Sequence, residues 1–306
     1  FGSIRRFNET FRDLFGRPPS ALRRKAGAAE SARDGVTLRL AYRPPYDWDS
    51  MLHYLQARAI DGLEIVEEDL YRRTVTHEGL TGSVTIEHRP VNHCLLATIC
   101  FPSVRALQAI VSRIRHQFDV GADIEAIAAH LSKDEALAPL IAALPGLRAP
   151  GCWNGFELAA RAVLGQQITV AAARRLGAAL VDLWGEPLLD KEDRRLTRTF
   201  PTADRLAAAD LTRLGMPSAR RATVTALAQA ASANPNLFMP GGSIDERVAQ
   251  LRAIPGVGAW TAEYIALRAF REPDAFPATD LGLLRGATHL TGEGTLKASS
   301  LSQRAE

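Results

Sequence analysis

The feature that most constrains this chain is a change in the period of its apolar residues near residue 118. Before that point, several segments alternate apolar and polar residues as strands do. After it, alanine and leucine dominate, and proline and glycine separate short segments of helical period. The 306 residues are enough for two domains. The change of period therefore predicts an α+β domain over 36–117 and an all-α domain over 118–306.

The first of these regions reads as β-α-β-β-β-α. An antiparallel sheet covered on one face by helices satisfies this order. The strands are expected at 36–42, 63–76, 80–89 and 93–101, and the helices at 48–59 and 103–117.

The second region reads as many short helices, and no strand pattern interrupts it. We expect helices at 121–131, 133–143, 154–164, 169–184, 203–212, 218–231, 243–253, 259–270 and 281–288.

The first 25 residues differ from the rest of the chain in charge. They carry seven basic and two acidic side chains, whereas the remaining residues carry 30 and 32. A helix over 3–15, followed by a linker over 26–35, fits this segment, and its basic face could simply be solvated. The nearly neutral remainder has no broad basic field. If it binds nucleic acid, it needs local devices such as helix N-termini directed at phosphates.

Several classes of protein are excluded by composition. No apolar run is long enough for a membrane span, and the sequence contains no charged-then-apolar leader pattern, so we expect a cytoplasmic protein without membrane contact. Three cysteines cannot ligate a four-cysteine iron–sulfur cluster or a four-cysteine zinc site. We therefore expect no required cofactor and no iron–sulfur cluster.

The segment 251–280 carries the strongest functional pattern. Pro255, Gly256, Val257 and Gly258 separate two predicted helices, so the chain can reverse tightly and expose the first N–H groups of the second helix. Such a hairpin can bind a DNA phosphate without a cation, although an ordinary turn between helices has the same form. Asp280 follows Gly258 by 22 residues, where a new helix is expected to begin.

This segment resembles the helix-hairpin-helix (HhH-GPD) superfamily of DNA glycosylases, in which a catalytic aspartate follows the hairpin by a similar interval. The resemblance to the AlkA type, the bacterial 3-methyladenine DNA glycosylase II family, extends over about 37–306. It rests on "RPPYDWDSMLHYLQARAIDGLE", "LPGLRAPGCWNGFELAARAVLGQQIT" and "FPTADRLAAADLTRLGMPSARRATVTALA". Residues 1–25 are similar to the end of an AraC-type helix-turn-helix domain.

The resemblance implies a catalytic role for Asp280, whereas Asp274 is a competitor within the preceding loop. It implies a base pocket of Tyr54, Trp260, Tyr264 and Leu281. Aromatic faces attract a cationic alkylated purine. Leu281 replaces the tyrosine of the AlkA type, which puts one wall of the pocket in doubt. Each aromatic residue alone would more often be a core residue, whereas together, at matched positions, they favour a pocket.

The resemblance also implies a DNA-binding set. Gln167 would enter the duplex where the target base has left, in place of the leucine of the AlkA type, although it could be an ordinary polar loop residue. The hairpin would bind phosphates, and its carbonyl groups would bind Na⁺ or K⁺. The implied residues are Gln167, Pro255, Gly256, Val257, Gly258 and Thr261 for DNA, and Arg252, Ile254 and Gly256 for the cation.

The expected function is hydrolysis of the N-glycosidic bond of alkylated bases, such as 3-methyladenine and 7-methylguanine, in double-stranded DNA. Lyase members carry a lysine at the position of Trp260, so we expect a monofunctional enzyme. We also expect it to act as a monomer. A further pocket-lining helix is expected after residue 306. The alternative is a DNA-binding regulator of the alkylation response, whose helical domain only binds DNA.

Overall fold

A computed structural model describes residues 12, 35–188, 193–239, 241–291 and 297–305. The predictions for 1–25 and 26–35 therefore lie almost entirely outside the described residues. The chain forms two compact units, which we call the sheet unit and the helical unit. The sheet unit contains the residues up to Ile124 together with 146–148 and 186–199, and the helical unit contains the others. The units thus do not follow a single cut after residue 117.

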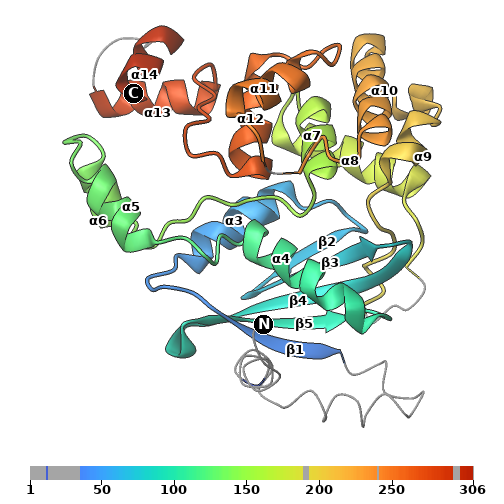
Figure 1. Cartoon of the computed structure of the whole chain (residues 1–306), viewed down its shortest axis with the longest axis horizontal. Coiled ribbons are helices and arrows are strands. Elements are labelled where there is room, and N and C mark those ends of the chain that lie inside the picture. The colour runs from blue at the N-terminus through green and yellow to red at the C-terminus, as the bar shows by residue number, and fades with distance from the viewer. Residues whose placement is uncertain (1–11, 13–34, 189–192, 240, 292–296, 306) are drawn as a thin grey trace. The chain divides into compact units, whose positions relative to one another are not determined.

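The sheet unit contains one antiparallel sheet of five strands in the order β1-β5-β4-β3-β2 (Figure 1). The predicted strand 63–76 is wrong as a single element, because the chain turns at 68–69 and pairs with itself. Glu68 adopts a left-handed conformation there, with φ 44°. The strands are β1 (Val36–Ala41), β2 (Glu64–Glu67), β3 (Leu70–His77), β4 (Leu80–Arg89) and β5 (Cys94–Cys100).

One face of the sheet is covered by α3 (Trp48–Arg58) and α4 (Leu107–Gln117), as the alternation predicted (Figure 1). The register aligns Leu40 with Leu95 on this face, and both side chains are buried. Trp48 of α3 stacks on Phe118, which directly follows α4, with ring centroids 5.6 Å apart. The α3 helix begins where Asp47 accepts a hydrogen bond from the Ser50 backbone N–H.

The other face is partly covered by 186–199, a segment distant in sequence from the strands. Leu188 and Leu196 form a buried apolar cluster with Ile65 of β2. The backbone N–H of Thr197 donates to the carbonyl of Gly62, and the Arg198 carbonyl accepts from the Thr74 hydroxyl. These contacts place a segment of the predicted helical region in the sheet unit.

The helical unit has the expected succession of short helices. The predicted helices 203–212 and 259–270 are each divided, the first by a 3-10 turn (Leu211–Leu214) and the second by a π-helical turn (Ala266–Phe270). The helices are α5 (Ile124–Leu131), α6 (Ala138–Ala143), α7 (Gly155–Leu164), α8 (Val170–Trp184), α9 (Ala203–Ala207), α10 (Ser218–Ala233), α11 (Ile244–Arg252), α12 (Ala259–Ile265), α13 (Leu281–Thr291) and α14 (Ala298–Ala305). The sequence patterns did not predict α14.

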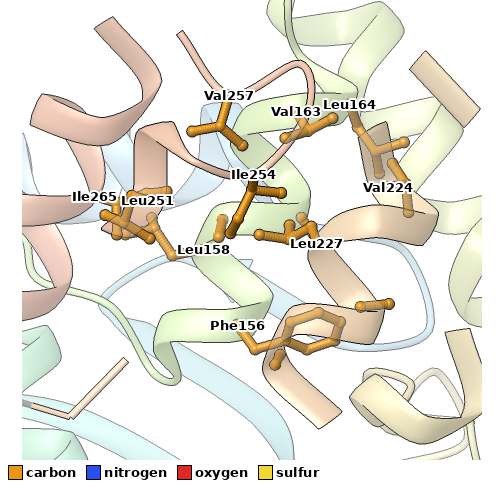
Figure 2. Close-up of a cluster of buried hydrophobic side chains, with 14 of the residues drawn as sticks. Phe156, Leu158, Val163, Leu164, Val224, Leu227, Leu251, Ile254, Val257 and Ile265 are labelled. Carbon is orange, nitrogen blue, oxygen red and sulfur yellow. The ribbon is translucent and has the colours of Figure 1, made fainter. Parts of the chain in front are cut away.

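The core of the helical unit is built around α7. Eight of its ten residues are buried, including Phe156, Leu158 and Val163, and the buried Glu157 pairs with Arg161 one turn later. Figure 2 shows these apolar side chains packed among residues of α10 and of the α11–α12 hairpin: Val224, Leu227, Leu251, Ile254, Val257 and Ile265. Among the described helices, none is both long and apolar enough to cross a bilayer.

Candidate active site

The hairpin between α11 and α12 is anchored from within by two apolar side chains. Ile254 and Val257 are buried in the core, and the Val257 N–H donates to the Ile254 carbonyl at 3.0 Å (Figure 2). Pro255, Gly256 and Gly258, between and beside them, are exposed. The alternation of buried and exposed residues therefore presents the backbone of the turn to solvent.

The two hairpin glycines meet different requirements. Gly256 has φ +85°, and a Cβ atom there would lie 1.8 Å from the Thr223 hydroxyl oxygen on α10. Glycine is therefore needed at 256 by the fold itself. Gly258 has an ordinary extended backbone, and a Cβ atom there would meet nothing within 4 Å. No described side chain caps α12 at this residue.

Two aromatic residues lie one turn apart on α12, on the side opposite its buried residues. The rings of Trp260 and Tyr264 are stacked, with centroids 5.1 Å apart and planes inclined by 12°. The Arg268 guanidinium lies 5.8 Å from the Tyr264 ring centre and donates a hydrogen bond to the Pro150 carbonyl. Both aromatic residues are half-buried, and Tyr264 also packs against the apolar core; we call this stacked pair the aromatic platform.

Asp280 is held at the edge of this platform by three hydrogen bonds. Its Oδ2 accepts from the Trp260 indole N–H at 2.9 Å. Its Oδ1 caps α13 by accepting from the N–H groups of Gly282 and Leu283, at 2.8 and 3.0 Å. All three partners are donors, which matches an ionised carboxylate because that group has only acceptors.

The loop that leads to Asp280 is also fixed. Glu263 of α12 accepts a hydrogen bond from the Phe276 backbone N–H, and burial raises the pKa of its carboxyl group. Ala275 and Pro277 are buried. Asp274 in the same loop is exposed, and it is Asp280 whose carboxylate meets the platform.

The turn between α7 and α8 lies against the hairpin. Gln167 is exposed at its tip, in a left-handed conformation with φ 58°. The preceding Gln166 donates from its amide nitrogen to the Gly256 carbonyl and the Thr261 hydroxyl, both at 3.2 Å. Arg220 of α10 donates to the Gln166 carbonyl at 2.5 Å. Neither Gln166 nor Arg220 was expected in the site, although the paired glutamines after an apolar helix were a signal.

The remaining predicted residues lie apart from this group or have other contacts. Leu281 begins α13 and is 66% exposed. Tyr54 belongs to the sheet unit, where the Arg58 guanidinium lies 4.0 Å from its ring centre. Of the proposed cation ligands, the Ile254 carbonyl accepts from Val257 and the Gly256 carbonyl from Gln166. The described residues contain no cluster of histidine, cysteine and acidic side chains suited to a metal ion.

Comparisons with known proteins agree with this architecture. Residues 37–154 match the AlkA N-terminal domain family. Over 296 residues, the chain is 39% identical to a probable bifunctional transcriptional activator/DNA repair enzyme AlkA of Mycobacterium tuberculosis, covering 95% of this chain and 59% of that protein. Over 244 residues, it is 35% identical to DNA-3-methyladenine glycosylase 2 of Escherichia coli, covering 79% and 83% of the two chains.

Solved structures share the fold at lower identity. A 3-methyladenine DNA glycosylase from Archaeoglobus fulgidus superposes with a TM-score of 0.77 at 22% identity, covering 87% of this chain and 91% of its own. An 8-oxoguanine glycosylase/lyase from Clostridium acetobutylicum, in complex with double-stranded DNA, gives 0.60 at 14% identity, covering 79% and 90%. The expected fold, an antiparallel sheet followed by a helix-hairpin-helix domain, is therefore confirmed.

Proposed function

Because this chain belongs to the DNA-3-methyladenine glycosylase 2 family, as its identity to the Escherichia coli member shows, we propose that it removes alkylated bases from double-stranded DNA. The observation that carries the proposal is the Asp280 carboxylate held against the Trp260–Tyr264 platform. The chain spans 59% of the length of the Mycobacterium tuberculosis relative, which is described as a DNA repair enzyme.

The platform selects the base. A purine alkylated at N3 or N7 carries positive charge, and the electron-rich faces of Trp260 and Tyr264 attract it. To reach them, the nucleotide must leave the base stack and enter the site. Leu281, the first residue of α13, is proposed to line the same site of the helical unit.

Asp280 supplies the charge that the reaction needs. When the bond between the sugar C1′ and the base nitrogen breaks, the electron pair leaves with the base and positive charge develops on the sugar. The Asp280 carboxylate stabilises that charge and directs a water molecule to C1′. Addition of water, with loss of its proton, leaves an abasic site and the free base.

The hairpin holds the DNA backbone. The first N–H groups of α12 face a turn whose exposed glycine, Gly258, leaves room for a phosphate oxygen. The exposed Pro255 and Gly256 belong to the same surface, whereas Val257 and Thr261 are buried beneath it and support it from within. These contacts position the duplex without reading its sequence, while the exposed Gln167 enters the space left by the base.

The activity proposed is monofunctional. Trp260 occupies the position at which lyase members carry a lysine, and the sequence has no lysine between Lys191 and Lys297. Without an amine nucleophile, no Schiff base forms with the sugar. Borohydride treatment during turnover should therefore trap no protein–DNA adduct, and an abundant trapped adduct would refute the monofunctional proposal.

Two further properties are proposed. A monovalent cation would bind the hairpin carbonyls of Arg252, Ile254 and Gly256. The hydrogen bonds that two of these carbonyls already accept leave each with one further lone pair. If the cation binds, replacing Na⁺ or K⁺ by a bulky organic cation at equal ionic strength should weaken DNA binding. We also propose that the enzyme acts as a monomer, which sedimentation would test.

A regulatory role is the second candidate. The Mycobacterium tuberculosis relative is described as a transcriptional activator as well as a repair enzyme. We propose that 1–25 ends an AraC-type DNA-binding domain and is not needed for excision. A chain beginning near residue 34 should then excise bases at the same rate as the longer protein. Loss of excision would show that the N-terminal segment takes part in the reaction.

Substitution of Asp280 by asparagine tests the main proposal. Asparagine is also a good N-cap, so Asp280→Asn should keep α13 and its binding to abasic DNA. Single-turnover release of 3-methyladenine, measured in the full-length protein, should fall by about 10³-fold because the charge is lost. Near-normal release would overturn the assignment of Asp280.

A further inference from the structure

We propose that Gln166 and Arg220 are positioning residues that join the hairpin to the inserting residue Gln167. This inference rests on the proposed glycosylase function. It concerns how a side chain that enters DNA is kept in place by groups that do not themselves enter it.

The side chain of Gln166 connects the turn to both parts of the hairpin. Its amide nitrogen donates to the Gly256 carbonyl in the turn and to the Thr261 hydroxyl in the first turn of α12, each at 3.2 Å. Because a carbonyl can only accept, the amide nitrogen must face the hairpin and its orientation is fixed. Thr261 is only 2% exposed, so one acceptor of this anchor lies within the core, whereas the hydrogen bond to the Gly256 carbonyl is exposed.

Arg220 holds the backbone on the other side of Gln166. Its guanidinium donates to the Gln166 carbonyl at 2.5 Å. That carbonyl belongs to the peptide group joining Gln166 to Gln167, so its direction is coupled to the backbone angles of Gln167. Gln167 has φ 58°, a conformation that costs free energy for any residue except glycine. The Arg220 hydrogen bond therefore stabilises the conformation that exposes Gln167.

The same helix supports the hairpin directly. Thr223 lies three residues after Arg220 and so on the same side of α10, and it packs closely against Gly256. The first turns of α10 therefore contact both the hairpin and the glutamine turn. Consequently the phosphate-binding backbone and Gln167 form one braced assembly, and binding a phosphate places Gln167 at a fixed offset along the duplex.

The inference predicts a defect that depends on whether the target base is paired. Gln166→Leu keeps the side-chain volume and removes the two hydrogen bonds. Excision of 7-methylguanine opposite cytosine should slow about tenfold, since an unbraced Gln167 no longer holds the base out of the stack. When 7-methylguanine lies opposite an abasic site, it is already unpaired, and the rate should stay within about threefold of the wild-type rate.

Two further variants identify the residue through which Gln166 acts. Arg220→Gln removes the hydrogen bond to the Gln166 carbonyl. Excision by this variant should also slow on the paired duplex and stay near the wild-type rate on the unpaired one. In a Gln167→Ala background, adding Gln166→Leu should slow excision from the paired duplex by no more than about twofold, because coupled residues are not additive. Thermal melting of each variant gives its folded fraction, by which the rates are normalised.

The opposite results would overturn the inference. An equal slowing on both duplexes would mean that Gln166 only supports the hairpin. If the rate reductions of the two single variants multiply in the double variant, Gln166 does not act through Gln167. Failure of the wild-type protein to release 7-methylguanine from either duplex, or an unchanged rate in Asp280→Asn, would instead refute the proposed function and this inference with it.

Discussion

The sheet unit buries a linked group of ionisable side chains beneath its helices, whereas the polar residues of the candidate site in the helical unit lie at the surface. In the sheet unit, Glu64, Tyr71 and Arg73 are buried together: the Tyr71 hydroxyl donates to Glu64 at 2.6 Å, and the Arg73 guanidinium lies 3.8 Å from the same carboxylate. Burial raises the pKa of Tyr71, so its hydroxyl stays a donor. In the helical unit, Asp280 and Gln167 stand at helix ends and reach solvent. Polar groups that satisfy one another specify the fold, whereas those held at the surface are available for chemistry.

Arg148 is another buried ionisable side chain of the sheet unit. Its guanidinium is buried, donates to the carbonyls of Arg43 and Asp119, and lies 4.5 Å from the Tyr46 ring centre. The neighbouring Gly146 accepts from the Asp47 N–H and packs on Pro45. These contacts explain why 146–148 belongs to the sheet unit, although its sequence neighbours belong to the helical unit.

The largest effect should come from breaking the buried pair. Glu64→Gln leaves Arg73 buried without its counter-charge, so the free energy of unfolding should fall by about 3–5 kcal/mol. Glu87→Gln removes an exposed carboxylate of β4 from its ion pair with Arg89, and should cost about 1 kcal/mol or less. Denaturant unfolding measures both. Equal losses would mean that burial does not set the importance of charge in the sheet unit.

The two hairpin glycines, Gly256 and Gly258, should differ in whether their substitution lowers stability or DNA binding. Gly256→Ala should lower the free energy of unfolding by about 2–4 kcal/mol, because φ is positive and the new Cβ meets Thr223. Gly258→Val should change stability by about 0.5 kcal/mol or less, because its backbone is ordinary and its surroundings are open. It should still weaken binding to damaged and undamaged duplexes about tenfold by blocking a phosphate. Wild-type DNA binding by folded Gly258→Val would show that the hairpin is only a structural turn.

A smaller effect should separate the two roles of Trp260. Trp260→Phe keeps a ring to stack on Tyr264 but removes the indole N–H that orients Asp280. Excision should fall about tenfold, for cationic and neutral bases alike, because one charge-assisted hydrogen bond is lost. Trp260→Ala also removes the platform, so it should impair excision of cationic bases more than that of neutral ones. If Trp260→Phe discriminates between bases as strongly as Trp260→Ala, the indole N–H has no separate role.

Much of this structure could be predicted because helix ends and the period of apolar residues depend on only a few neighbouring residues. The helix expected from residue 48 begins there, and Asp280 stands where a new helix begins, as expected. The period of the apolar residues separated sheet from helices. The β2–β3 turn was missed because Glu68-Asp69 contains neither glycine nor proline, so nothing local marks the reversal.

The rest depends on contacts between distant residues, which no local pattern records. The sequence around 186–199 gives no sign that Thr197 will pair with Gly62. The meeting of Trp260 with Asp280 depends on the path of the intervening loop, which Glu263 fixes through Phe276. Gln166 acquires its contacts only when the hairpin, 90 residues later, packs beside it.

The smallest effect should come from the exposed charges that fasten 186–199 to the sheet. Hydrogen bonds from the Arg195 side chain and backbone hold the pKa of Asp193 well below its usual range, and Arg195 lowers the pKa of Glu67 as well. A carboxyl group with a lowered pKa stabilises the folded state above its ordinary pKa, near 4, and loses this contribution as the pH falls through the folded value.

The stability difference between wild type and Arg195→Gln should therefore stay constant from about pH 7 to 5 and shrink below about pH 4. Denaturant titrations across this range measure it. Molar salt should also reduce it, because the Arg195 and Glu67 side chains are exposed. Excision at neutral pH should be unchanged, since this cluster serves the sheet unit alone. A stability difference that grows on acidification would contradict the stabilisation of these carboxylates by Arg195. An Arg195→Gln protein that is folded but slow in excision would show that the cluster also serves the reaction.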